Sequence, residues 1–279
     1  MPGLVIGHRQ ASVSKEHTVT PFPAGQIEDG AKRADGDSSS EVWIGRIALP
    51  SGAASVYFKM QSTRQFWVES VCARLADAAG LPTGGLNWGR IERRDLPDSK
   101  QWNSGESERV VLAVQAIRGT TLERMCESIV PETLQGSPTY PLMCAFDELI
   151  ANGDRHNENL LVDGRGQYWL IDHGHAFGGP EHDLANPYPA FENPLLAMAI
   201  LNKRLRARQT LAVELASAIA MLGDAMKHVG EVLALAPEAK VMQRFLQARY
   251  DSLRDLLAAR FEIDGQGSLR LPTPRPIER

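Results

Sequence analysis

A short segment near the middle of the chain concentrates ionisable and amide side chains around two apolar runs. Residues 152–177 read NGDRHNENLLVDGRGQYWLIDHGHAF and include Asp154, His156, Asn159 and Asp172. Two carboxylates and one amide oxygen are hard oxygen ligands. They suit a Mg²⁺ ion that keeps some of its water and borrows other ligands from a phosphate chain. These residue types point to chemistry on phosphates, provided that the fold brings Asp154, Asn159 and Asp172 together.

The two apolar runs predict a small β-hairpin that meets this condition. Residues 160–162 and 167–171 are β-prone, and Asp163-Gly164-Arg165-Gly166 between them is turn-forming. A hairpin holds the loop that enters its first strand beside the residue that follows its second strand, so the three oxygen ligands should converge. The alternative interpretation is ordinary turn chemistry, in which Asp and Asn side chains bond their own backbone.

The order and spacing of these residues carry a family resemblance. The strings GDRHNENLLV and IDHGHAF resemble the catalytic and metal-binding loops of HipA-like serine/threonine kinases, and equally those of phosphatidylinositol 3- and 4-kinases. Protein kinases have H-R-D-x-x-x-x-N, with the Asp-to-Asn step that Asp154 and Asn159 show here. The resemblance implies that Asp154 orients or deprotonates the acceptor hydroxyl and that Asn159 and Asp172 hold the metal. It also implies that His156 lies near the transferring phosphoryl group, whereas Arg155 is interpreted as structural.

The N-terminal part carries candidates for two further parts of such a site. The string SVYFKMQSTRQFWVESVCARLADAAGLPTG resembles the K…E…GLP layout of HipA-like proteins. In kinases a strand lysine pairs with the nucleotide phosphates and a helix glutamate orients it. The resemblance gives these roles to Lys59 and Glu69. Order along the chain then places a hinge where backbone groups of Gln115, Ala116 and Ile117 meet the adenine edge.

Two features depart from the kinase pattern. The metal-loop triplet is Asp172-His173-Gly174, with His where Phe is usual. No string matches the phosphate-cradling G-x-G-x-x-G, and the candidates that remain are the short run 50–55 and the longer polar run 24–40. Three histidines nearby lack the spacing of a zinc site and are interpreted as hydrogen-bonded structural residues: His173, His175 and His182.

The elements that must position these residues divide the chain into two parts. Alternation of apolar residues predicts strands, and helical spacing predicts a helix that contains Val68 and ends near Gly80. The expected strands lie at 41–49, 55–60 and 109–117, and the expected later helices follow apolar stripes at 142–150, 211–226 and 238–261.

This pattern predicts an α+β, bilobal protein-kinase-like fold. The strand-rich N-lobe, with one helix and the nucleotide-binding lysine, spans 1–117. The mostly helical C-lobe, with the catalytic and metal-binding loops, spans 118–279. Polar, Gly- and Ser-rich composition predicts a flexible loop at 24–40, and the proline-rich end predicts an extended tail at 270–279.

Composition limits the kinds of partner and the cell compartment that we expect for the protein. The 279 residues have 43% hydrophobic content and a formal net charge of −4, so no global positive field attracts nucleic acid or anionic membrane. Cys72, Cys126 and Cys144 show no metal-ligand spacing. The N-terminal string MPGLVIGHRQ is a poor signal peptide, and no run approaches the roughly 18 apolar residues of a membrane span. We therefore expect a soluble, cytoplasmic protein.

The resemblance implies an ATP- and Mg²⁺-dependent kinase that transfers the γ-phosphoryl group to a Ser or Thr hydroxyl of a protein. One alternative is a phosphoinositide kinase, which the GDRHNEN loop equally fits. The other is a pseudokinase that acts as a binding or regulatory module. HipA-like proteins are often toxins or regulators paired with a neighbouring protein, so the resemblance also permits an antitoxin-like partner.

Overall fold

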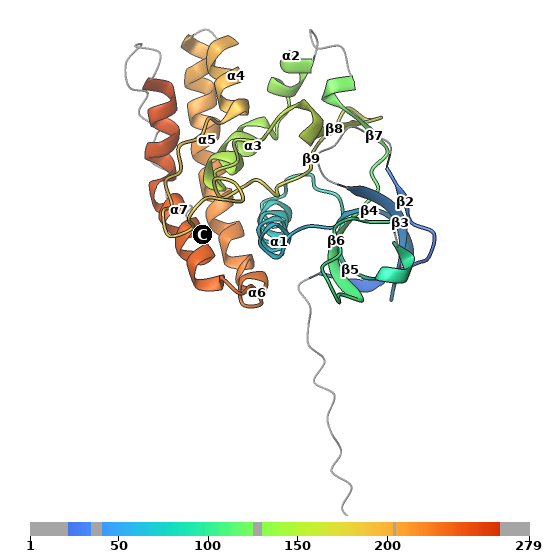
Figure 1. Cartoon of the computed structure of the whole chain (residues 1–279). Coiled ribbons are helices and arrows are strands. Elements are labelled where there is room, and N and C mark those ends of the chain that lie inside the picture. Colours follow the sequence, from blue (N-terminus) through green and yellow to red (C-terminus); the bar gives the residue numbers. More distant parts are fainter. Residues whose placement is uncertain (1–21, 35–40, 97, 125–129, 203–204, 263–279) are drawn as a thin grey trace, which may run out of the picture.

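The computed structural model describes residues 22–34, 41–96, 98–124, 130–202 and 205–262. The predictions for the tail at 270–279 and for the first residues of the chain fall outside these ranges. Within them, the strands of the first 115 residues form one sheet, and the helices from residue 130 onward pack together. Helix α1 (Thr63–Ala78) lies between the sheet and the other helices (Figure 1).

The main sheet has six strands among the described residues. In chain order they are β1 (Ala24–Ile27), β2 (Lys32–Arg33), β3 (Val42–Leu49), β4 (Gly52–Lys59), β5 (Leu86–Glu92) and β6 (Glu108–Gln115). Their order in the sheet is β1-β5-β6-β4-β3-β2, and β1 pairs with β3 as well as with β5. That second pairing closes the sheet on itself.

Strands β1 and β2 correct the prediction of a loop at 24–40. Ile27 pairs with Ile47, and Lys32 pairs with Ile44. Strand pairing uses backbone groups, so polar composition does not prevent it, and the buried Ile27 side chain anchors β1 in the core. Residues 35–40 of the predicted loop lie outside the described ranges.

Helix α1 ends where its sequence signal predicts, and its start is fixed by a cap that the sequence analysis did not identify. The Ser62 side chain accepts the backbone N–H of Gln65, and the Gln65 side chain accepts that of Ser62, which together form a capping box. Gly80, with a φ of 77°, follows the helix end and takes the left-handed conformation that glycine adopts easily.

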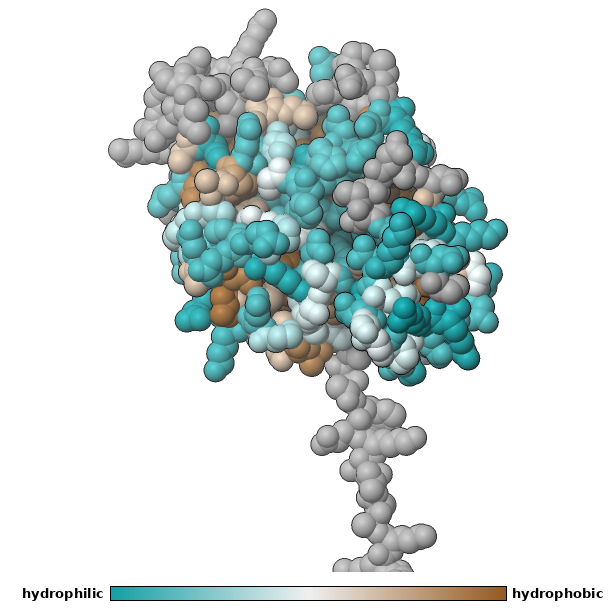
Figure 2. All heavy atoms as spheres, in the orientation of Figure 1, coloured by the Kyte–Doolittle hydropathy of each residue, from teal (hydrophilic) through white to brown (hydrophobic). Residues whose placement is uncertain are grey.

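The remaining helices are α2 (Val130–Gln135), α3 (Tyr140–Leu149), α4 (Pro194–Asn202), α5 (Leu205–Ala225), α6 (Gly230–Leu233) and α7 (Ala239–Glu262). Short 3₁₀ turns lie at Arg93–Asp95, Leu122–Arg124, Asn157–Asn159 and Met226–His228. The predicted stripes in α3, α5 and α7 face the core, which includes Phe146, Leu215 and Phe245. No helix in the described ranges is long and apolar enough to cross a membrane. Hydrophilic residues cover most of the face in Figure 2.

The predicted hairpin belongs to a second, three-stranded sheet. It consists of β7 (Gly119–Thr121), β8 (Leu160–Asp163) and β9 (Tyr168–Leu170), in that order. In the turn, Oδ1 of Asp163 accepts the backbone N–H of Arg165 at 2.8 Å and of Gln167 at 3.0 Å. Strand β7 follows soon after β6, so this sheet joins the end of the main sheet to the hairpin.

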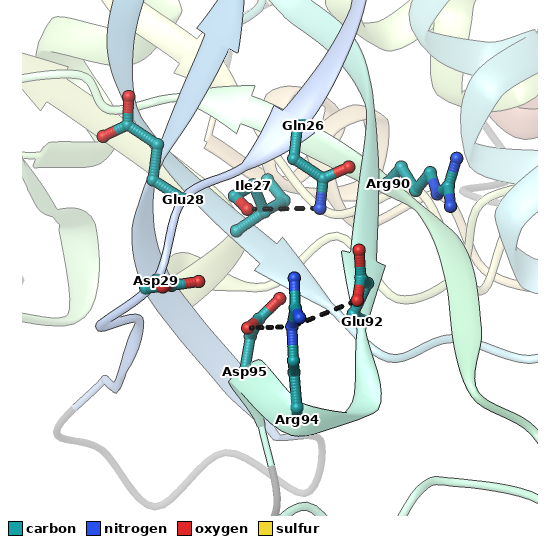
Figure 3. Close-up of a pocket in the computed structure, with 8 residues that line it drawn as sticks. All are labelled: Gln26, Ile27, Glu28, Asp29, Arg90, Glu92, Arg94 and Asp95. Carbon is teal, nitrogen blue, oxygen red and sulfur yellow. Dashed lines mark hydrogen bonds and ion pairs between the residues drawn. The ribbon is translucent and has the colours of Figure 1, made fainter.

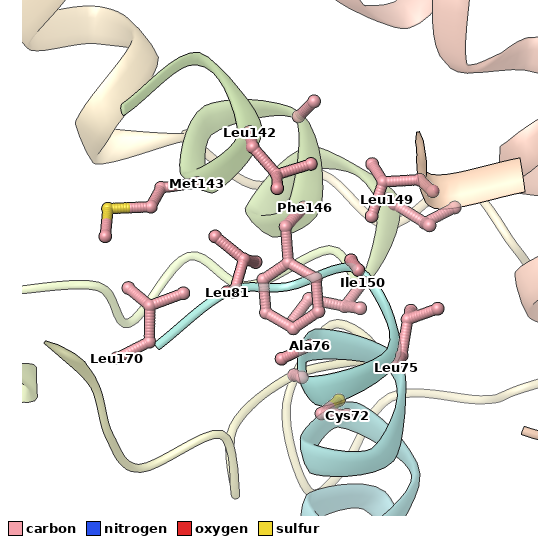
Figure 4. Packing of buried hydrophobic residues seen from close by; sticks show 14 of the residues in the cluster. Cys72, Leu75, Ala76, Leu81, Leu142, Met143, Phe146, Leu149, Ile150 and Leu170 are labelled. Atoms are coloured by element: carbon pink, nitrogen blue, oxygen red, sulfur yellow. The ribbon is translucent and has the colours of Figure 1, made fainter. Parts of the chain in front are cut away.

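The core packs α1 against α3. Phe146 of α3 lies above Cys72 and Ala76 of α1, with Leu81 beside it, and all four side chains are buried (Figure 4). Apolar burial on this scale is the main favourable term in folding. The two helices therefore hold a fixed relation to each other, and the residues that they carry do too.

A buried polar network ties α7 to α3. The Arg249 guanidinium donates to the carbonyls of Glu148, of Leu149 at 2.9 Å and of Pro187 at 2.9 Å. The Glu148 carboxylate also accepts Arg260 at 3.2 Å. Burial lowers the pKa of Arg249 to about 10, which still leaves it charged at neutral pH.

Replacing Arg249 with Met should destabilise the protein by about 3 kcal/mol or more, because it leaves the buried carbonyls of Glu148, Leu149 and Pro187 without this donor and removes one of the two arginines beside the buried Glu148 carboxylate. Arg244→Met, on the exposed side of the same helix, is the matched control and should change stability by less than about 0.5 kcal/mol. Urea denaturation measures both, and equal effects would contradict the assignment.

Candidate active site

A buried arginine fixes the loop that the sequence singles out. Nε and an Nη of Arg155 donate to the two carboxylate oxygens of Asp147 on α3, at 2.9 and 3.0 Å. Its other Nη donates to the carbonyls of Asn159 at 3.1 Å and of Ile171 at 2.7 Å. Both side chains of the ion pair are fully buried. Arg155 therefore ties the loop and the strand end before Asp172 to one helix.

The amide of Asn159 is oriented by its neighbours. Its nitrogen donates to the carbonyl of Asp154 at 2.7 Å and lies 3.2 Å from Nε2 of His156. The Asp154 N–H in turn donates to the side-chain oxygen of Asn152 at 3.1 Å. Because the Asn159 nitrogen is engaged, its side-chain oxygen is left as a possible ligand. Asn159 also bonds to the residue before Asp172, since its backbone carbonyl accepts the N–H of Ile171 at 3.2 Å.

Asp172 pairs with Lys59 across the site. The Lys59 ammonium donates to Oδ2 of Asp172, and both side chains are partly buried. Burial favours the neutral acid, but the attraction of Lys59 outweighs it, so the pKa of Asp172 lies below its ordinary value. Burial likewise opposes the charge of Lys59, but Asp172 raises its pKa above the ordinary value. Both groups are therefore charged at neutral pH.

Asp172 also has a left-handed backbone, with a φ of 57°. A residue with a Cβ adopts this region at a cost of about 1–3 kcal/mol, and such residues gather at functional sites. This conformation turns the chain sharply after β9. The turn returns His175 toward the catalytic loop.

Glu69 reaches the same site but forms no direct ion pair with Lys59. Its Oε1 accepts the backbone N–H of His173 at 3.4 Å, and its Oε2 accepts the side-chain amide of Gln61. Burial raises the pKa of Glu69 to about 7, and the Asp172 charge adds to this effect. The structure thus places Glu69 near Lys59, while the ammonium pairs with Asp172 instead.

Two histidines flank Asp154, and sequence reasoning assigned only one of them to the site. Nδ1 of His175 lies 3.6 Å from Oδ2 of Asp154, and Nε2 of His156 lies 3.9 Å from Oδ1. The His175 side chain is half-exposed and lies beside Asp154, a position that its interpretation as a hydrogen-bonded structural residue did not include. Its sequence signal was its place just after the metal-loop triplet. His182 does have a structural bond, between Nε2 and the carbonyl of Asn186 at 2.7 Å.

His173 occupies the position where kinases usually have Phe, and it is buried like one. Its ring contacts Phe146 edge to face, with 5.5 Å between centroids. Burial lowers the pKa of His173 to about 3, and the nearby Arg155 charge contributes. The imidazole is therefore neutral at neutral pH. Its buried Nε2 has no hydrogen-bond partner among the described residues, so the interpretation of His173 as a hydrogen-bonded residue is wrong for this nitrogen.

The predicted hinge donors are engaged within the sheet. The N–H of Gln115 donates to the carbonyl of Gly85 at 2.7 Å, and the N–H of Ala116 donates to that of Ser55 at 2.9 Å. These two N–H groups are therefore not available to an adenine ring. The backbone groups of the predicted hinge that can still bond an adenine edge are the N–H of Ile117 and the carbonyl groups of this segment.

An apolar row beside Lys59 was missed. Tyr57 pairs with Ile44 on one side and with Val114 on the other, so the three side chains share one face of the sheet. Lys59 lies two residues along β4 and shares that face. Ile44 and Tyr57 are 39% and 41% exposed, although both are large apolar residues. The sequence signal for this row was the alternation of side chains along the strand, because Tyr57 lies two residues before Lys59 and so shares its face.

Strand register decides between the two candidate phosphate loops. Lys59 pairs with Val42, whereas Gly52 pairs with Leu49 at the other end of the β3–β4 hairpin. Gly52 lies seven residues before Lys59 along β4. At about 3.3 Å per residue, this end of the run 50–55 is roughly 20 Å from Lys59, so the run is wrong as a candidate phosphate loop. The β2–β3 connection starts at the end of the hairpin where Lys59 lies. There the N–H of Ala34 donates at 2.8 Å to the carbonyl of Val42, the residue that pairs with Lys59.

Two surface cavities lie in the described ranges. One, of about 610 Å³, is lined by Gln26 and Ile27 of β1 and by charged side chains that follow β1, lie on β5 or belong to the turn after β5 (Figure 3). There Arg94 pairs with Glu92 at 3.1 Å and with Asp95 at 3.7 Å, and none of the residues that line this cavity belongs to the predicted site. The other, of about 420 Å³, opens beside the β3–β4 turn and Gln115.

Comparison with known proteins supplies the family. Residues 55–255 match the sequence profile described as HipA-like kinase. The chain belongs to the HipA-like kinase family. Because the matched range runs from β4 into α7, it contains Lys59, Glu69, the loop of Asp154 and Asn159, and Asp172. No curated protein matches this kinase.

The fold is also that of a solved kinase. The HipA-like kinase resembles the crystal structure of a Helicobacter pylori proinflammatory kinase, CtkA, with a TM-score of 0.52 and 13% sequence identity. The match covers 86% of this chain and 98% of the other. At this identity the likeness shows the mixed α/β fold alone.

The residues present fit a Mg²⁺ ion, which kinases of this kind use with ATP. An ionised Asp172 and the free oxygen of Asn159 are hard ligands, and the Lys59 ammonium shows that a cation is stable beside Asp172. In the described ranges, no three His, Cys, Asp or Glu side chains gather as a metal site. A site with few protein ligands, completed by phosphate and water, agrees with both observations.

Replacing His173 with Phe should remove part of the pH dependence of stability. The folded-state pKa of about 3 lies below the ordinary 6.5, so the stability is fully present above pH 6.5 and is lost as pH falls toward 3. Between pH 7 and pH 5, the wild-type kinase should lose about 2 kcal/mol more than His173→Phe. Urea denaturation in chelator tests this, and parallel pH profiles would contradict it.

Removing the Lys59 ammonium should strengthen metal binding in the absence of nucleotide, because the ammonium and a cation compete for Asp172. We expect Lys59→Met to bind Mn²⁺ about tenfold more tightly than wild type. Lys59→Arg, which keeps the charge, should not. Paramagnetic resonance of free Mn²⁺ measures the affinity of both variants. An unchanged affinity in Lys59→Met would show that the Lys59 ammonium does not compete with the metal for Asp172.

Proposed function

We propose that this kinase transfers the γ-phosphoryl group of ATP, in a Mg²⁺-dependent reaction, to a Ser or Thr hydroxyl of a protein. One observation carries the proposal: the Lys59 ammonium contacts Asp172 beside Glu69, on the strand end that Arg155 ties to the loop of Asp154. This arrangement gathers a cation for phosphates, a carboxylate and an amide oxygen for a metal, and a second carboxylate for a hydroxyl.

In this proposal, Lys59 binds phosphate oxygens of the nucleotide, and Asp172 and Asn159 hold the cation. A bound Mg²⁺ would offset charge on the phosphates and fix their orientation. Glu69 keeps the Lys59 ammonium in place once nucleotide has drawn it from Asp172. Catalysis of this kind is mainly positioning and electrostatic stabilisation.

Asp154 aligns the acceptor hydroxyl and accepts its proton. The carboxylate is half-exposed, so a protein substrate can reach it, and the backbone around it is held by Arg155 and Asn152. His156 and His175, at 3.9 and 3.6 Å, add donors beside the carboxylate. In this proposal they orient the carboxylate toward the acceptor hydroxyl.

The adenine ring lies on the row of Ile44, Tyr57 and Val114, with its polar edge toward Ile117. A flat apolar surface beside a polar backbone edge suits a purine. The residues up to 117 then act as an N-lobe and those from 118 as a C-lobe, with the nucleotide between them. The β7–β8 pairing, which begins at Gly119, supports a short connection there.

Asp154→Asn should reduce phosphoryl transfer at least a hundredfold while nucleotide binding survives, because the carboxylate acts on the acceptor and not on ATP. Asp172→Ala should lose Mg²⁺-dependent nucleotide binding as well. Asp251→Asn, on the exposed face of α7, is the control and should behave as wild type.

Labelled ATP with Mg²⁺ and two acceptors, a dephosphorylated protein mixture and phosphoinositide vesicles, measures the transfer. Label in Ser or Thr of protein supports the proposal. Label in lipid alone would identify a phosphoinositide kinase instead. If wild-type protein binds nucleotide but transfers nothing, including to itself, a pseudokinase is the better description.

A further inference from the structure

Gln61 lies between the strand that carries Lys59 and the helix that carries Glu69. Strand β4 ends at Lys59 and Ser62 caps α1, so Gln61 belongs to the short connection between them. Its amide nitrogen donates to Oε2 of Glu69, whose other oxygen accepts the N–H of His173 at 3.4 Å. Glu69 is therefore held on one side by Gln61 and on the other by the metal-binding loop.

The oxygen of the same amide is buried and has no hydrogen-bond partner among the residues that the structure describes. An amide nitrogen can only donate hydrogen bonds, and this one donates to Oε2 of Glu69. The bond to Glu69 therefore points the nitrogen of Gln61 at Glu69 and turns the oxygen away from it. Buried acceptors are almost always satisfied in folded proteins, so this one indicates a donor that arrives in another state of the site.

Gly174 shows how closely these groups converge. A Cβ built on Gly174 would lie 3.6 Å from Oδ1 of Asp172, 3.7 Å from the Gln61 nitrogen and 3.7 Å from Oε2 of Glu69. The amide thus belongs to the same cluster as the carboxylate that pairs with Lys59. Lys59 lies two residues before Gln61, and its ammonium has three N–H groups, of which one donates to Asp172 in this structure.

We propose that Gln61 is a positioning residue of the kinase site. Its amide nitrogen holds Glu69, and its amide oxygen accepts an N–H of Lys59 once Asp172 has turned from Lys59 to the cation. The three N–H groups of the ammonium then serve Glu69, Gln61 and a phosphate oxygen. This inference rests on the proposed function, and it adds a neutral acceptor to the lysine–glutamate pair.

The test compares Gln61→Met with wild type in binding a fluorescent ATP analogue. Met keeps the length of the side chain but removes both hydrogen-bonding groups. With MgCl₂ we expect the dissociation constant to rise about tenfold, as for one lost hydrogen bond to a charged group. With chelator and no divalent ion, the two proteins should bind alike, because Lys59 still pairs with Asp172.

A double-mutant cycle separates this role from a structural one. In a Lys59→Met background, Gln61→Met should weaken binding no further, because the amide acts through the ammonium. Gln65→Met is the matched control, since Gln65 is the same residue type and bonds to the Ser62 cap of the same helix. It should leave Mg²⁺-dependent binding unchanged.

Wild-type affinity in Gln61→Met, or an equal loss in both backgrounds, would overturn the inference and leave the proposed function standing. A wild-type protein that binds no nucleotide would overturn both. Thermal melting without nucleotide reports folding of each variant. Should Gln61→Met not fold, Gln61→Asn takes its place with the same expectations, because it keeps an amide but withdraws it by one methylene.

Discussion

The Arg155–Asp147 ion pair is the contact on which the candidate site depends. A fully buried charge is tolerated only when it is paired and its other hydrogen-bonding groups are satisfied. Arg155 meets this condition by bonding Asp147 with two groups and the carbonyls of Asn159 and Ile171 with a third. The need to satisfy one guanidinium therefore fixes a helix, a loop and a strand end relative to one another. The geometry of the candidate site therefore follows from the need to pair one buried arginine.

A second ion pair, Lys59–Asp172, joins the strand-rich part of the chain to this fixed framework. The two residues lie far apart in sequence. Each is also a candidate ligand, Lys59 for the phosphates of the nucleotide and Asp172 for the metal. Binding of the complex must therefore separate them, and phosphate and cation each release the partner of the other. Nucleotide and metal should on this account bind with positive coupling. Glu69 and Gln61 are placed to receive the ammonium when that exchange occurs.

Local signals in the sequence were enough for much of the fold. The hairpin at 160–170 and the end of α1 at Gly80 follow from turn and capping chemistry, and the family follows from the loop spacing. What could not be predicted depended on tertiary contacts. The position of His175 beside Asp154 is one such contact, and it comes three residues after the left-handed backbone of Asp172. The engaged N–H groups of Gln115 and Ala116 depend on strand register, which propensity does not specify.

Strand β1 was the largest error, and its position has a consequence for the behaviour of the protein in solution. Because β1 bonds to both β5 and β3, neither of those strands presents a long row of unpaired backbone groups at that seam. An open edge of that kind invites the strands of other molecules to add to it. Strand β1 thus protects this seam against the addition of strands from other molecules. A chain shortened to begin after residue 27 would expose that seam and should be prone to aggregate.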